Sequence, residues 1–170
     1  LLLQALQGVD IPRLLMVIVP RHPQRFGEVA ALLERERLAY QRRSANQPIA
    51  AGTQVVLGDS MGEMFAYYAA CDVAIIGGSL LAFGAQNLIE ACAVGRPVII
   101  GPHIYNFAEA TQLALEAGAA VQVDDARGAI AVARELLRDP ARAQRMAQAG
   151  VEFTRRHQGA TGKILGLLKF

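Results

Sequence analysis

Short apolar runs alternate along this chain with longer stretches in which apolar residues recur at helical spacing. The runs have the length and β-branching of buried strands, which we expect at residues 14–19, 39–43, 54–57, 73–76, 97–100 and 121–123. The helical stretches lie at residues 23–37, 60–71, 87–94, 108–117, 125–138 and 141–156. This alternation predicts an α/β protein, a Rossmann-like three-layer domain whose parallel sheet of about six strands is covered on both faces. We expect residues 1–170 to form one such domain.

The stretch from Gly77 to Glu90, G-G-S-L-L-A-F-G-A-Q-N-L-I-E, joins a predicted strand to a predicted helix. Its glycines let a ligand approach the backbone, and the first helical turn presents unpaired N–H groups to an anion such as a phosphate. Asn87 and Glu90 share one face of that turn, where a carboxylate can accept hydrogen bonds from a ribose diol. A plain loop with a dipole-favouring carboxylate explains the same residues, and both interpretations stay open.

Two earlier loops also follow predicted strands. Arg21 and His22 come directly after the first strand, where an arginine fork can clamp a phosphate or carboxylate, or simply remain solvated. After the third strand, Ser60 and Glu63 have the S-x-x-E spacing of a helix capping box. The cap alone would explain that loop.

A fourth loop leaves the strand at residues 97–100. It carries His103 and Asn106, and Asn106 is placed to cap the following helix, with Glu109 three residues on. Because the carboxyl ends of parallel strands share one edge of a sheet, we expect the polar residues of all four loops to converge on one crevice. The sequence therefore predicts a nucleotide or sugar-phosphate site.

Composition excludes several other classes of function. The net charge of +2 and the absence of a basic stripe interleaved with aromatic residues argue against nucleic-acid binding. No G-x-G-x-x-G follows the first strand and no G-K-[ST] occurs, which argues against a nicotinamide dehydrogenase and a P-loop protein. Cys71 and Cys92 lie in apolar surroundings, and no ligand spacing predicts a metal site.

The two ends of the chain suggest a piece of a longer protein. It begins without a methionine at Leu1-Leu2-Leu3, and no run approaches the roughly 18 apolar residues of a membrane span. The apolar segment 164–170 is expected to dock on another surface. The basic face of the last two helices is typical of a solvated surface, with a membrane or partner domain as the alternative.

Four motifs in register resemble one family: V-P-R-H-P, L-G-D-S-M-G-E, G-G-S-L…G-x-x-N-x-x-E and G-x-P-V-x-x-G-P-H-x-x-N-F. Together they resemble the carboxyl-terminal domain of 3-deoxy-D-manno-octulosonic acid (Kdo) transferases, over residues 14–159. Those enzymes are two-domain GT-B glycosyltransferases of lipid A and lipopolysaccharide assembly at the inner membrane. The resemblance implies that this chain binds the donor CMP-Kdo without a further cofactor or metal.

The family's donor-site motifs imply particular ligand residues here. The implied nucleotide-binding residues are Arg21, His22, Met61, Gly62, Glu63, Gly78, Ser79, Asn87 and Glu90. Gln86, His103 and Asn106 are further candidates. By the same resemblance, Glu90 takes the ribose hydroxyls, while Arg21 and the loop amides take the phosphate.

The resemblance also implies what this chain lacks. In the family the general base and most of the surface for the lipid A precursor and the membrane belong to the amino-terminal domain, so no catalytic residue is expected here. The isolated chain should bind CMP-Kdo and not turn it over. Gln86 and Leu88 replace a histidine and a proline of many relatives, which places any role of an ionisable imidazole in doubt. Two alternatives remain: the donor half of another GT-B enzyme, such as a UDP-sugar transferase or epimerase, or a non-catalytic nucleotide-binding module.

Overall fold

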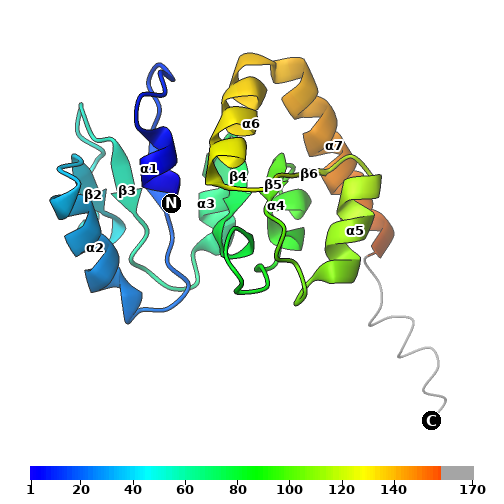
Figure 1. Ribbon diagram of the computed structural model, residues 1–170, viewed down its shortest axis with the longest axis horizontal. Coiled ribbons are helices and arrows are strands. Elements are labelled where there is room, and N and C mark those ends of the chain that lie inside the picture. The colour runs from blue at the N-terminus through cyan, green and yellow to red at the C-terminus, as the bar shows by residue number, and fades with distance from the viewer. Residues whose placement is uncertain (158–170) are drawn as a thin grey trace, which may run out of the picture. The chain divides into compact units, whose positions relative to one another are not determined.

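The computed structural model of the protein describes residues 1–157 and has the predicted α/β architecture (Figure 1). Its strands are β1 (Met16–Ile18), β2 (Tyr40–Arg42), β3 (Val55–Leu57), β4 (Ala74–Ile76), β5 (Val98–Ile100) and β6 (Ala120–Gln122). Its α-helices are α1 (Leu2–Leu6), α2 (Arg25–Arg35), α3 (Met64–Ala70), α4 (Ile89–Ala93), α5 (Ala108–Glu116), α6 (Ala126–Arg138) and α7 (Pro140–His157). Two short 3₁₀ turns are η1 (Arg43–Ala45) and η2 (Gly77–Ser79). The apolar segment 164–170 lies outside the described residues.

All six strands pair in parallel, as predicted, but they form two ladders of three rather than one continuous sheet. The strand orders are β1-β3-β2 and β4-β5-β6. The chain correspondingly divides into two compact units. The first comprises residues 10–67, and the second comprises, among the described residues, 1–9 and 68–157.

The unit of residues 10–67 is built on its central strand, β3. Every residue of β3 is buried, and Leu57 is fully so. Helix α2 packs on this sheet through Ala30 and Leu33, which lie three residues apart and therefore on one helix face. The sheet in turn fixes where the loops after β1, β2 and β3 begin.

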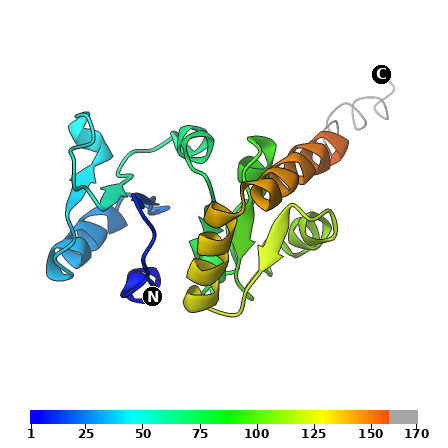
Figure 2. The same ribbon diagram turned by 90° about the horizontal axis from the view of Figure 1, so that it is seen from above.

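The second unit has three layers (Figure 2). Because successive side chains of a strand point to opposite faces, Ile100 packs into one core with α4 and α5, while Ile99 packs into a second core with α6. Leu2 of α1 adds to the second core. The apolar-run pattern therefore identified a sheet that is buried on both faces.

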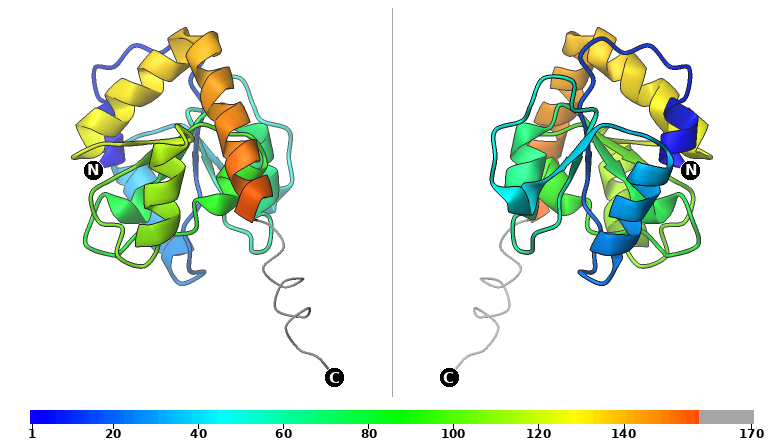
Figure 3. Two further views of the ribbon diagram at one scale, coloured as in Figure 1. Left: turned by 90° about the vertical axis from the view of Figure 1, so that its right-hand side faces the viewer. Right: turned by 90° about the vertical axis from the view of Figure 1, so that its left-hand side faces the viewer.

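Helices α6 and α7 meet at a sharp bend (Figure 3). Asp139 and Pro140 lie at the bend, as the sequence predicted, because proline cannot continue the hydrogen-bond ladder of α6. Helix α7 then packs on α4. A Cβ atom at Gly150 would lie 3.2 Å from both the Cα and the carbonyl oxygen of Cys92, so glycine permits this close approach.

Two helix starts differ in detail from the predictions. Asp125 caps α6 as expected, and its carboxylate accepts a hydrogen bond from the Gly128 amide at 2.8 Å. The prediction that Asn106 caps the next helix is wrong, because α5 begins after Phe107 without a side-chain cap and the Asn106 amide has another partner. Helix α4 begins only at Ile89, where Asn87 accepts a hydrogen bond from the Ile89 amide at 3.0 Å.

The contact between α7 and α4 predicts a difference between two helical glycines. Gly150→Val should cost about 1–3 kcal/mol, because the new side chain meets the backbone of α4. Gly27→Val in α2 meets nothing within 4 Å and should change stability by less than about 0.5 kcal/mol. Thermal unfolding of both variants checks this. Equal melting temperatures would contradict the assigned packing.

Candidate functional site

The glycine-rich stretch after β4 is a folded loop anchored by a buried serine. Ser79 is fully buried, and its hydroxyl donates to the Ile76 carbonyl at 2.5 Å and accepts from the Gly101 amide at 2.6 Å. The same hydroxyl therefore joins the ends of β4 and β5. The side chain of Ser79 therefore acts inside the fold, where it fixes the loop to the sheet.

Two consecutive left-handed residues turn the loop back on itself. Gly84 has φ +82° and Ala85 has φ +70°, which is an unfavourable conformation for a residue with a side chain. Ala85 is nevertheless fully buried, and its amide donates to the Gly78 carbonyl at 3.3 Å. The side chain of Gln86 then covers Gly78, where a Cβ atom would lie 2.4 Å from its amide nitrogen. A side chain at position 78 would have to displace the Gln86 amide.

Asn87 and Glu90 form the polar pair that their spacing predicted. The Asn87 side-chain amide donates to the Glu90 carboxylate at 3.2 Å, and both residues are half-buried. Tyr68 faces this pair: burial, with the nearby charge of Glu90, raises its pKa to about 12. The carboxylate is thus oriented by one amide and retains acceptor positions for a diol.

The loop after β5 lies against the glycine-rich loop. The His103 amide donates to the Ser79 carbonyl at 3.0 Å. Asn106 donates through its backbone amide to Gly84 and through its side-chain amide to Phe83, both at 3.1 Å. The structure therefore gathers Gly78, Ser79, Gln86, Asn87, Glu90, His103 and Asn106 at the carboxyl edge of one sheet.

In the unit of residues 10–67, a network centred on Asp59 joins the loops after β2 and β3. The Asp59 carboxylate, 4% exposed, accepts hydrogen bonds from the Ser44 hydroxyl at 2.7 Å and the Ser44 amide at 2.8 Å. Arg42 lies 3.6 Å from it. Burial pushes the pKa of Asp59 up, but the Ser44 hydrogen bonds and the Arg42 charge outweigh it and lower the pKa overall.

Glu63 belongs to a second part of the same network. It accepts hydrogen bonds from the Ser60 hydroxyl and from Arg43, the latter at 2.9 Å. The Ser60 hydrogen bond and the Arg43 charge lower the pKa of Glu63. These side chains bond to one another, so the predicted capping box, in which each would bond the backbone, is wrong. The carboxylate of Glu63 shapes its loop, and exposed Met61 and Gly62 form the loop's accessible part.

The sequence analysis did not single out Arg43 and Ser44. They could have been found from the rule that the carboxyl ends of parallel strands share one edge of a sheet. Both residues follow β2 directly, at the same edge as the loops after β1 and β3. Arg21 and His22 lie after β1 and are exposed, as expected for residues that await a ligand or remain solvated. Each unit therefore has its own polar carboxyl edge. That the two edges meet around one ligand stays a prediction.

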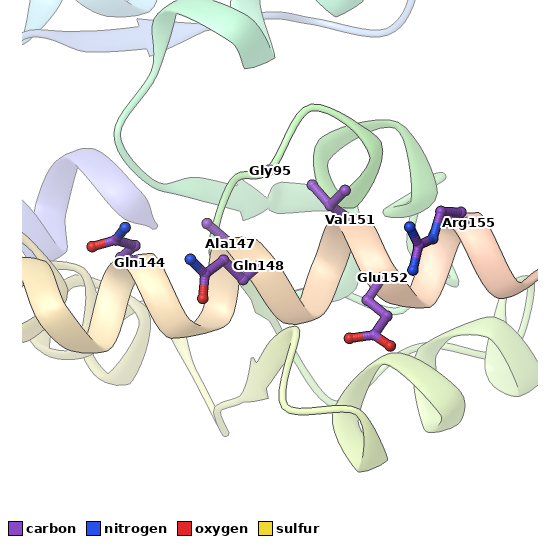
Figure 4. A pocket seen from close by; sticks show the side chains of 7 residues that line it. All are labelled: Gly95, Gln144, Ala147, Gln148, Val151, Glu152 and Arg155. Carbon is purple, nitrogen blue, oxygen red and sulfur yellow. The ribbon is translucent and has the colours of Figure 1, made fainter.

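The described residues also contain a pocket beside α7 whose lining includes none of the predicted ligand residues (Figure 4). Its lining consists of Gly95, Gln144, Ala147, Gln148, Val151, Glu152 and Arg155. Glu152 is paired with Arg156 of the same helix. The lining offers no convergent polar groups, so we place the candidate site at the carboxyl edges instead.

The cysteines behave as small buried groups. Burial raises the pKa of Cys92 to about 11, and it raises the pKa of Cys71 as well. Within residues 1–157 no three His, Cys, Asp or Glu side chains are grouped to hold a metal ion. In the same residues no helix combines the length and apolar character that a membrane crossing requires.

The chain belongs to the family of glycosyl transferases group 1, whose model matches residues 1–153. It is 52% identical over 93% of its length to the 3-deoxy-D-manno-octulosonic acid transferase of Bordetella pertussis and 41% identical, also over 93%, to that of Haemophilus influenzae. The chain spans 37% of the length of each. It also resembles the crystal structure of the C-terminal CMP-Kdo binding domain of WaaA from Acinetobacter baumannii. There the TM-score is 0.84 at 32% identity, covering 89% of this chain and 80% of that one.

The Asp59 network predicts a pH-dependent contribution to stability. A lowered pKa means that the contribution is complete above the ordinary aspartate pKa of about 4 and is lost as the pH falls through the lower folded value. Asp59→Asn should therefore cost about 1–3 kcal/mol at neutral pH, with a difference from wild type that shrinks below about pH 4. Acid unfolding monitored by circular dichroism measures it. The exposed Asp10→Asn is the control, and a pH-independent deficit in Asp59→Asn would argue against a role for the charge.

Proposed function

We propose that this chain is the donor-binding half of a Kdo transferase and binds CMP-Kdo. The observation that carries the proposal is the likeness, at 32% identity, to the C-terminal CMP-Kdo binding domain of WaaA. The identity of 52% to a Kdo transferase supports the same family of reactions. The residues that motif matching assigns to the donor lie at carboxyl strand edges, where open α/β folds bind ligands.

The glycine-rich loop and the start of α4 would hold the nucleotide. Glu90, oriented by the Asn87 amide at 3.2 Å, accepts hydrogen bonds from the ribose hydroxyls. The exposed backbone at Gly77 meets the phosphate, whose negative charge suits N–H donors and the start of a helix. Ser79 contributes by fixing the loop, since its hydroxyl is already bonded at both ends.

In the unit of residues 10–67, the loops after β1 and β3 carry further residues that the motifs assign to the donor. Arg21 and His22 are exposed and free to approach an anionic group, and Arg21 can bind a phosphate bidentately. The Met61-Gly62-Glu63 loop presents its backbone, with Gly62 at φ +79° and the Glu63 carboxylate tied back by Arg43. This arrangement predicts that Glu63 shapes the loop while its neighbours contact the ligand.

The chemistry assigned to this half is stabilisation of the leaving group. In the transfer, the bond between the anomeric carbon of Kdo and the phosphate oxygen breaks as an acceptor hydroxyl attacks that carbon. CMP departs with the bonding electrons, and N–H groups and Arg21 stabilise its phosphate. A general base outside this chain takes the hydroxyl proton. The acceptor of the transfer would be a lipid A precursor at the cytoplasmic face of the inner membrane. Because the general base lies outside this chain, the isolated chain should bind CMP-Kdo without transferring Kdo.

Calorimetric titration with CMP, UMP and AMP tests the proposal. CMP should bind most tightly, and Glu90→Ala should weaken it roughly tenfold, because ribose hydroxyls lose a charged acceptor. The control is Glu109→Ala, an exposed carboxylate in the first turn of α5. Preference for UMP would instead favour a UDP-sugar enzyme. Equal, Glu90-independent binding of all three would count against the donor site.

A further inference from the structure

We propose that Asn106 is a positioning residue that holds the glycine-rich loop in the shape in which Asn87 and Glu90 meet the donor. The inference rests on the proposed function and assigns Asn106 a role through the loop rather than on the nucleotide. Tyr105 and Asn106 together contact three consecutive residues of the loop, Ala82 to Gly84.

Donors from Tyr105 and Asn106 occupy the three carbonyls of this segment. The Tyr105 hydroxyl donates to Ala82 at 2.9 Å, and the Asn106 side-chain amide donates to Phe83 at 3.1 Å. The Asn106 backbone amide donates to Gly84, also at 3.1 Å. Asn106 thus binds two successive carbonyls with its two amide groups, which fixes the orientation of the peptide planes between them.

The segment held in this way is the one where the loop reverses. Gly84 and Ala85 are both left-handed, and a Cβ atom at Gly84 would lie 2.4 Å from the Asn106 amide nitrogen. The conformation at Ala85 is costly for a residue with a side chain, so surrounding contacts must maintain it. Asn106 on one side and the Ala85–Gly78 hydrogen bond on the other provide such contacts.

The reversal leads directly into the candidate ligand residues. Gln86 covers Gly78, Asn87 accepts a hydrogen bond from the Ile89 amide, and Glu90 is bonded to Asn87. Only two residues separate Gly84 from Asn87, so a change of the peptide planes at Phe83 and Gly84 shifts the Asn87–Glu90 pair. The side-chain amide of Asn106 is already bonded to Phe83, which is why we assign it to the loop and not to the nucleotide.

Hydrogen exchange tests the inference without any ligand. Asn106→Ala should increase exchange at amides 82–88 and leave the amides of β4–β6 unchanged, because only the loop loses its support. Tyr105→Phe is the matched control, since it removes one exposed hydrogen bond and keeps the ring against Gly84. Unchanged exchange at 82–88 in Asn106→Ala would overturn the inference, whatever the protein binds.

A double-mutant cycle with CMP tests the link to the donor site. Asn106→Ala should weaken CMP binding roughly three- to tenfold without changing the melting temperature of the protein. In the Asn106→Ala background, Glu90→Ala should then reduce the CMP affinity by a smaller factor than it does in the wild type. Full additivity of the two losses, or unchanged affinity in Asn106→Ala, would overturn the positioning role. Failure of wild type to bind CMP would instead overturn the proposed function, and the exchange result would still decide the role of Asn106 in the loop.

Discussion

Parallel pairing of short strands is the constraint on which the rest of this structure depends. In a parallel ladder every strand ends at the same edge, so residues far apart in sequence become neighbours there. Strands of three residues suffice because each is buried between helices or lies beside a buried strand, as Val55–Leu57 and Val98–Ile100 show. The β1-β3-β2 ladder thereby gathers loops that carry Arg21, Arg43, Ser44 and Glu63, and the β4-β5-β6 ladder gathers loops that carry Ser79, Asn87 and His103.

The loops at these edges are held more firmly than their glycine content suggests. Ser79 bonds the ends of two strands, and Asp59 bonds the backbone and hydroxyl of Ser44. These buried groups are satisfied by partners from neighbouring loops, which makes each contact costly to lose. The consequence is a division of roles: buried polar side chains shape the loops, and exposed backbone together with Arg21, His22 and Glu90 remain available to a ligand.

Apolar periodicity predicted the α/β fold and all six strands to within a few residues, because buried strands and amphipathic helices follow from local pattern. It did not predict that the six strands would separate into two ladders, since the pairing partners of a strand depend on long-range packing. The same limit applies to Asn106. Its position before α5 favoured a helix cap, and only tertiary structure shows that its amide bonds Phe83, twenty-three residues away.

The candidate site divides in the same way. The Asn87–Glu90 contact follows from helical spacing and was predictable, whereas the Arg43–Glu63 contact joins two loops separated by twenty residues and was not. Resemblance supplied what neither spacing nor geometry could, namely the donor that we propose. The structure adds which members of the motif shape the loops and which remain accessible to a ligand.

The most direct test of the central claim is to map amide chemical shifts by nuclear magnetic resonance during addition of CMP. The account predicts saturable shifts at three places: the loop with Arg21 and His22, the Met61-Gly62-Glu63 loop, and the stretch from Gly77 to Glu90. Absence of shifts at these loops, or shifts centred on the pocket beside α7, would contradict the assignment of the donor to the residues at the carboxyl edges.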